Sequence, residues 1–141
     1  MSRKIIINVP NKEEHLKNPM EIGLDNDWKV KRRKMDKRIN AKGVYVLYVS
    51  NPLRIIHVGQ TRGPTMDFGT RLYRHATKSA SSDSRVYRTL KKAEQENGGS
   101  ILVSLLTTVQ IRSFFEGEEL EDEAIIDIYE QVAIHLLNPK V

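Results

Sequence analysis

The stretch 43–49, GVYVLYV, constrains the fold more than any other part of this 141-residue chain. Its β-branched and aromatic side chains favour a strand, and they fall on both faces because successive side chains alternate. A strand that is apolar on both faces is typical of the centre of a sheet that is covered on both sides. The stretch 55–59, IIHVG, follows the turn-like residues 50–54, SNPLR, so the two stretches predict an antiparallel hairpin.

The rest of the chain predicts two helices, a third strand and a last helix, in that order, at residues 70–78, 85–97, 101–109 and 121–137. Helices must cover the faces of the sheet, so we expect an α+β fold in which a small three-stranded antiparallel sheet is flanked by helices. Residues 43–141 would form this domain. Residues 1–42 would be a basic N-terminal extension with a short strand at 5–7 and Trp28 as its anchor.

Charge is distributed unevenly along the chain. The net charge is +5, yet residues 1–92 carry 21 basic and 8 acidic side chains, whereas residues 93–141 carry 2 basic and 10 acidic ones. Seven of the ten residues at 29–38, KVKRRKMDKR, are basic, and neither Gly nor Pro interrupts them, so we expect a basic helix there. A solvated face or a disordered arm is the alternative. The uneven distribution of charge between residues 1–92 and 93–141 indicates a surface for a polyanion and a separate acidic region.

Composition excludes several classes of protein. There are no cysteines, which excludes disulfides, thiolate zinc sites, iron–sulfur clusters and cysteine nucleophiles. No apolar run approaches the ~20 residues that a membrane-spanning helix needs, so we expect no membrane partner. The apolar stretch near the N-terminus is too short for a signal peptide, and a cytoplasmic protein is the default expectation.

Four polar residues stand out in the predicted elements. Tyr45 and His57 each lie in an apolar strand, and the hairpin would bring them close together. Arg71 and His75 are four residues apart, which places them on one face of a helix. Arginine binds phosphate through a planar fork of donors, and histidine exchanges a proton near neutral pH. Core packing of the tyrosine and histidine, and a solvated helix face, are the structural alternatives.

Glu130 is the most informative acidic residue. Its segment AIIDIYEQVAIHLL is apolar nearly all round, which indicates a helix that is mostly buried. A lone carboxylate is expensive to bury, so Glu130 needs an arginine, a hydrogen-bond network or a metal ion. A divalent cation is a natural partner for such a carboxylate, and a structural ion pair is the alternative.

Together these residues resemble the GIY-YIG nuclease family. Gly43-Val44-Tyr45 resembles the first half of the signature, and His57-Val58-Gly59 followed by Gln60-Thr61 resembles the second half, where a tyrosine usually stands in place of His57. Residues 71–75, RLYRH, resemble the family's Arg-x3-His. Glu130 resembles the metal-binding glutamate of the last long helix, and Asn138 resembles the terminal asparagine. The resemblance spans residues 43–139.

The resemblance implies metal-assisted hydrolysis of phosphodiester bonds. Glu130 would hold one Mg²⁺ or Mn²⁺, and Arg71 would bind the scissile phosphate. Tyr45 would abstract a proton from the attacking water, with help from His75, because the pKa of a free tyrosine, ~10, matches neutral pH poorly. Asn138 would orient a ligand or a backbone turn. His57 would either take part in catalysis or only fill space.

The compact chain is most similar to family members that act as restriction endonucleases, which often form homodimers to cut both strands. We therefore expect a double-stranded DNA substrate and a restriction-type, phage or mobile-element endonuclease. A structure-specific nuclease with little sequence preference, or a catalytically silent nucleic-acid-binding relative, is the alternative. The expected DNA-binding residues are Lys31, Arg32, Arg33, Lys34, Gln60, Thr61, Arg62 and Arg74.

Overall fold

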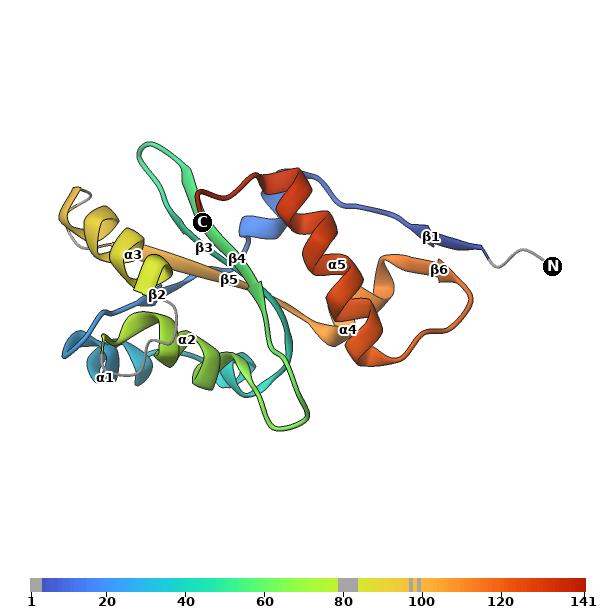
Figure 1. The fold of residues 1–141 in the computed structure, drawn as a ribbon, viewed down its shortest axis with the longest axis horizontal. Coiled ribbons are helices and arrows are strands. Elements are labelled where there is room, and N and C mark those ends of the chain that lie inside the picture. Colours follow the sequence, from blue (N-terminus) through green and yellow to red (C-terminus); the bar gives the residue numbers. More distant parts are fainter. Residues whose placement is uncertain (1–3, 79–83, 97, 99) are drawn as a thin grey trace.

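A computed structural model describes residues 4–78, 84–96, 98 and 100–141 (Figure 1). Its strands are β1 (Ile5–Ile7), β2 (Met20–Ile22), β3 (Gly43–Val49), β4 (Arg54–Gln60), β5 (Ile101–Thr107) and β6 (Phe115–Gly117). Its α-helices are α1 (Asp27–Arg32), α2 (Phe68–Ala76), α3 (Ser84–Glu96), α4 (Thr108–Ser113) and α5 (Asp122–Leu137). Two short 3-10 helices are η1 (Lys12–Leu16) and η2 (Lys37–Asn40).

The expected α+β fold is confirmed, but the three-stranded sheet was wrong. Within the described residues, the main antiparallel sheet has four strands in the order β2-β5-β3-β4, and β1 and β6 pair in a separate two-stranded sheet. The additional strand β2 pairs with β5 through Met20–Val103 and Ile22–Ile101, which buries Ile22. Residues 20–22, MEI, lack the run of β-branched residues that marks the strand at 5–7, so the sequence does not reveal β2 and its pairing with β5 fixes it.

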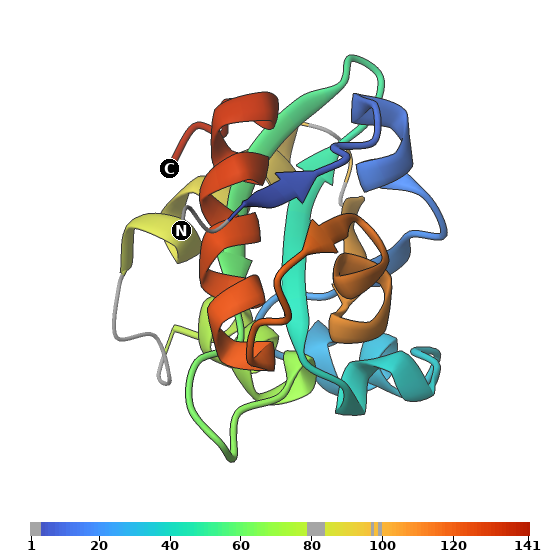
Figure 2. The same ribbon diagram turned by 90° about the vertical axis from the view of Figure 1, so that its right-hand side faces the viewer.

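The main sheet is the middle layer of three (Figures 1 and 2). One apolar cluster joins one face of the sheet to α1, α2 and α3, and a second cluster joins the other face to α4 and α5. Alternate residues of β3 enter the two clusters, so that Tyr45 and Leu47 belong to the first and Val44 and Val46 to the second. This confirms the prediction of a central strand that is covered on both sides.

The β3–β4 hairpin forms as predicted, with Tyr45 opposite Gly59 and Leu47 opposite His57. The register then shifts by one residue, and Ile56 is the extra residue of a β-bulge. Ile55 therefore belongs to the apolar cluster of α5, and Ile56 to the cluster on the Tyr45 side. Strict alternation would have placed Ile55 on the face of His57.

The segment 4–42 is tied into both sheets. It supplies β1 and β2, and Trp28, Met35 and Ile39 are buried in the same cluster as Tyr45. The expected anchoring role of Trp28 is thus confirmed. The helix expected over residues 29–38 was wrong in extent, because α1 ends at Arg32. A new 3-10 helix then begins after Asp36, whose carboxylate accepts a hydrogen bond from the Arg38 backbone N–H.

The C-terminal half agrees with the predicted elements except over residues 108–117, which form α4 and β6. The predicted helix 121–137 appears as α5, whereas the strand expected over 101–109 ends at Thr107. Thr107 and Gln110 form a capping box that starts α4, which replaces part of the expected connection. None of the helices in the described part of the chain is long and apolar enough to cross a membrane.

Candidate active site

The phenol of Tyr45 crosses the neighbouring strand at a glycine. Tyr45 is fully buried, and Gly59 lies directly opposite it on β4. A Cβ atom built on Gly59 would overlap the hydroxyl and Cζ of Tyr45 and would lie 3.0 Å from Nε2 of His57. Only glycine leaves room for the tyrosine ring here. The phenol can therefore pass over β4, which is an edge strand of the sheet.

Helix α2 places a histidine against that phenol. Asp67 caps the helix by accepting a hydrogen bond from the Thr70 N–H at 2.8 Å, and His75 is buried one turn after Arg71. Nε2 of His75 lies 2.6 Å from the Tyr45 hydroxyl oxygen. Their ring centroids are 5.8 Å apart. The two residues, from β3 and α2, therefore form a hydrogen-bonded pair that no local sequence signal predicts.

His57 completes a cluster of three rings. Its centroid lies 6.0 Å from that of Tyr45 and 5.1 Å from that of His75, edge to face. Its Nδ1 is 2.9 Å from the carbonyl oxygen of Val141 and donates to it. The proximity to Tyr45 across the hairpin agrees with expectation, and the contact with the C-terminal residue does not follow from any sequence pattern.

Burial and two charges set the protonation of Tyr45. Burial raises the pKa of the phenol, the Arg71 guanidinium lowers it through its charge and a hydrogen bond, and Glu130 raises it. The phenol is therefore protonated at neutral pH. A guanidinium can only donate, so the phenol oxygen accepts from Arg71, and with a neutral imidazole the hydroxyl hydrogen goes to Nε2 of His75.

Two polar atoms at the site are buried without a hydrogen-bond partner among the described residues. They are Nε of Arg71 and Oε1 of Gln60. Native proteins seldom leave buried polar atoms unpaired, and exceptions often mark the place of a ligand. Nε of Arg71 is a donor and Oε1 of Gln60 is an acceptor. The site can therefore bind an anionic group next to a cation or a hydrogen-bond donor.

Glu130 reaches this site from α5. Its carboxylate Oε1 accepts a hydrogen bond of 3.0 Å from Nε2 of Gln60, the last residue of β4. Glu130 is half-buried rather than enclosed, and none of the ion pairs found in the described residues includes it. The apolar seam of the helix is formed instead by Ile126, Tyr129 and Ala133.

A metal ion would need ligands from outside the protein. No group of three or more histidine or acidic side chains in the described ranges is placed to hold a metal ion alone. Glu130 offers one carboxylate, and Gln60 beside it offers an unpaired amide oxygen. This donor set fits Mg²⁺ or Mn²⁺, because Mg²⁺ takes one or two carboxylates and completes its shell with water and substrate phosphates.

Asn138 has a backbone role. It ends α5 with φ 49° and ψ 63°, in the left-handed region that asparagine adopts more readily than most residues, and its N–H donates to the Ile134 carbonyl. Its side chain is exposed and makes no hydrogen bond within the described part of the chain. The turn that follows leads Lys140 and Val141 along β4, where their N–H groups donate to Ile55 and Ile56.

The expected DNA-binding residues fall in three places. Gln60 and Thr61 are buried at the end of β4, where Oγ1 of Thr61 accepts a hydrogen bond from the Gly43 N–H at 3.1 Å. Arg62 and Arg74 are exposed, on the loop before α2 and on α2 itself. The others, Lys31, Arg32, Arg33 and Lys34, lie at the end of α1, where Lys31 pairs with Glu21 at 2.5 Å. No described contact joins this last group to Tyr45 or Glu130.

Lys42 was missed by sequence reasoning. Its ammonium donates to the Gly63 carbonyl at 2.6 Å and pairs with Glu123 at 3.1 Å. It therefore ties the loop between β4 and α2 to the start of α5, next to the site. A single lysine before Gly43 carries no pattern that could have identified this role.

Comparison of the chain with models of known protein families, with curated proteins and with solved structures finds no match. The fold and the site described above are therefore the basis for assigning a function.

Proposed function

We propose that this protein is a metal-dependent DNA endonuclease of the GIY-YIG type. The observation that carries the proposal is the convergence of Tyr45, Arg71, His75 and Glu130, from β3, α2 and α5, at one edge of the sheet. These four groups come from three segments that are far apart in the sequence, and each has the chemistry that phosphodiester hydrolysis needs. The buried Nε of Arg71 has no hydrogen-bond partner among the described residues, which leaves this donor for a ligand.

Arg71 binds the scissile phosphate in this proposal. Its Nε and its charge are available at the site, and a guanidinium matches the geometry of two phosphate oxygens. Because the group is held by α2 before substrate arrives, it stabilises the negative charge that develops on the phosphorus oxygens at no cost of reorganisation.

Tyr45 and His75 move the proton of the attacking water. A phenol with a raised pKa is a poor base on its own. As the water gives its proton to the phenol oxygen, the phenol gives its own hydrogen to Nε2 of His75, 2.6 Å away. The net result is a hydroxide nucleophile, a neutral tyrosine and an imidazolium, so the tyrosine never has to become a free phenolate.

Glu130 and Gln60 would hold the metal ion. When bound, a divalent cation neutralises charge on the phosphate and the leaving oxygen. The hydrogen bond from Gln60 orients the carboxylate, as an outer group commonly does for a metal ligand. We favour a restriction-type or mobile-element enzyme that acts as a homodimer on double-stranded DNA. Two copies related by two-fold symmetry can cut both strands.

Matched variants test the proposal. Glu130→Ala and Arg71→Ala should abolish cleavage of plasmid DNA in Mg²⁺ or Mn²⁺ while the circular dichroism spectrum stays unchanged. Asp127→Ala, which removes an exposed carboxylate from the same helix, and Arg88→Ala, which removes an exposed guanidinium from α3, should cleave like the wild type. Undiminished cleavage by Glu130→Ala would refute the site.

The products of the digest separate the alternatives. Discrete bands from mixed DNA support a restriction-type enzyme, whereas a smear or cleavage at branches only supports a structure-specific nuclease. Binding without cleavage across DNA and RNA substrates in both metals would indicate a catalytically silent relative and would contradict the proposed activity.

A further inference from the structure

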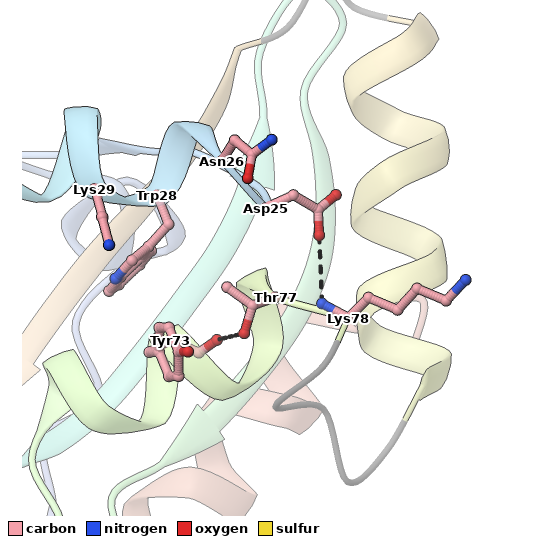
Figure 3. Close-up of a pocket in the computed structure, with 7 residues that line it drawn as sticks. All are labelled: Asp25, Asn26, Trp28, Lys29, Tyr73, Thr77 and Lys78. Carbon is pink, nitrogen blue, oxygen red and sulfur yellow. Dashed lines mark hydrogen bonds between the residues drawn. The ribbon is translucent and has the colours of Figure 1, made fainter.

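A groove runs between α1 and α2, apart from the proposed active site (Figure 3). It consists of two adjoining hollows, of about 390 and 310 Å³, which share Trp28 and Tyr73 as lining residues. The indole of Trp28 meets the Tyr73 ring edge to face, with the centroids 5.9 Å apart and an interplanar angle of 62°. Neither ring has a role in the proposed cleavage.

The two rings differ in exposure. Trp28 is 7% exposed and belongs to the core, whereas Tyr73 is 42% exposed on an otherwise polar side of α2. The buried indole fixes the exposed ring, because an edge-to-face pair has a preferred geometry. Tyr73 is thus an aromatic surface that is held in one orientation and open to solvent.

Three basic residues line the two hollows, and the acidic groups beside them are already engaged; the Lys78 side chain extends away from Tyr73 (Figure 3). Lys29 and Lys78 line one hollow and Arg32 the other, and none of the three forms an ion pair with a described residue. Asp25 accepts hydrogen bonds from the Tyr87 hydroxyl at 2.6 Å and from the Lys91 ammonium at 3.2 Å. Asp67, in the other hollow, caps α2.

We propose that this groove binds a single-stranded segment of DNA, with one base stacked on Tyr73 and the adjacent phosphates held by Lys29 and Arg32. An aromatic face flanked by free cations is the arrangement by which proteins bind unpaired nucleotides, since any base can stack and the backbone supplies the charge. A base inside a duplex cannot reach such a ring, so the bound segment is unpaired.

The position of the groove on α2 connects it to the proposed site. Successive residues of a helix are 100° apart, so Tyr73 lies 200° from Arg71, on the opposite side of α2. Arg74 lies on the exposed arc between them. A strand whose phosphate contacts Arg71 would cross the outer surface of α2, roughly 10 Å wide, past Arg74 to reach Tyr73. The inference rests on the proposed nuclease function in this respect: it names DNA with an unpaired stretch beside the cut as the substrate class, which favours the structure-specific alternative over the restriction-type form.

The chain contains its own probe for this groove, because Trp28 is its sole tryptophan. Titration of the full chain with a thymidine oligonucleotide of roughly 12 nucleotides should quench Trp28 fluorescence, and the affinity should fall as salt is added. Tyr73→Ala should weaken binding roughly 5- to 150-fold, the loss expected for one stacked base, whereas Tyr73→Phe should bind like the wild type.

Charge variants test the second half of the proposal. Replacement of Lys29 and Arg32 by glutamine should reduce the slope of log affinity against log salt by about 0.7 for each cation removed. Ile128→Ala, at an exposed apolar position on α5, is the matched control for Tyr73→Ala and should leave binding unchanged.

The outcome is independent of cleavage. A wild-type chain that binds the oligonucleotide through Tyr73 but cleaves no DNA in Mg²⁺ or Mn²⁺ would refute the proposed nuclease and leave the groove standing. Quenching by duplex DNA of the same length but not by the single strand would overturn the groove proposal. So would single-strand binding that Tyr73→Ala leaves unchanged.

Discussion

Alanine at Gly59 should be far more damaging than its single methyl group suggests. The added Cβ would overlap the hydroxyl and Cζ of Tyr45 and would lie 3.0 Å from Nε2 of His57, whereas ordinary van der Waals contact begins at about 3.4 Å. None of these neighbours is the free end of a flexible chain. The phenol is fully buried and bonded to His75, and β4 is paired with β3.

The magnitude follows from the two ways in which the structure can respond. If the hairpin shifts by a few tenths of an ångström, the cost is that of overpacking, about 1–3 kcal/mol. If the ring leaves its place, the cost approaches that of deleting a buried aromatic side chain, about 3–5 kcal/mol. We expect a loss of about 2–4 kcal/mol, together with a loss of cleavage at least as large as that caused by Tyr45→Phe.

Urea unfolding measures the first effect, and a plasmid digest measures the second. Gly69→Ala is the matched control, because Gly69 lies in α2 and its added Cβ would meet Cγ1 of Ile39 at 3.1 Å, a milder approach than the overlap with Tyr45 at Gly59. Alanine within a helix is favoured over glycine by about 1 kcal/mol, which offsets this approach. A Gly59→Ala variant that is as stable as Gly69→Ala would refute the close packing of Tyr45 over β4.

Two predictions concern pH. Burial raises the pKa of Tyr45, so the folded state keeps a proton that the unfolded chain releases above pH ~10. The free energy of unfolding should therefore fall as the pH rises above ~10. Urea titrations of Tyr45→Phe should show a smaller fall. Burial lowers the pKa of His15, whose Nε2 lies 2.6 Å from the Tyr129 hydroxyl, so stability that is present above pH ~6.5 should be lost as the pH falls further. His15→Gln should make the unfolding free energy less dependent on pH below ~6.5, and an unchanged dependence would contradict the burial of a neutral histidine.

The hairpin and the last helix could be predicted because their signals are local. The run 43–49 is apolar at every position, and α5 has an apolar pattern over more than four turns. The short strand predicted at residues 5–7 is confirmed as β1, but β2 and β6, of three residues each, were not predicted, because their pairing depends on partners far along the chain. No window of the sequence contains both partners, so periodicity could not reveal these strands.

The candidate site divides in the same way. The identities of Tyr45, Arg71, His75 and Glu130 could be selected from their placement on predicted elements. Their mutual distances depend on how α2 and α5 pack on opposite faces of the sheet (Figure 1). The hydrogen bond from Gln60 to Glu130 joins residues 70 positions apart and could not have been inferred.

By itself, the sequence determined a central strand that must be covered on both faces, a hairpin, a buried C-terminal helix and a set of residues suited to phosphate chemistry. Tertiary structure alone decided the fourth strand, the bulge at Ile56 and the contacts of Trp28 with Tyr73 and of Tyr45 with His75. The reason is physical. Alternation and helical period act between neighbours in the chain, whereas register, close approach at Gly59 and the pairing of polar groups depend on which surfaces the folded chain brings into contact.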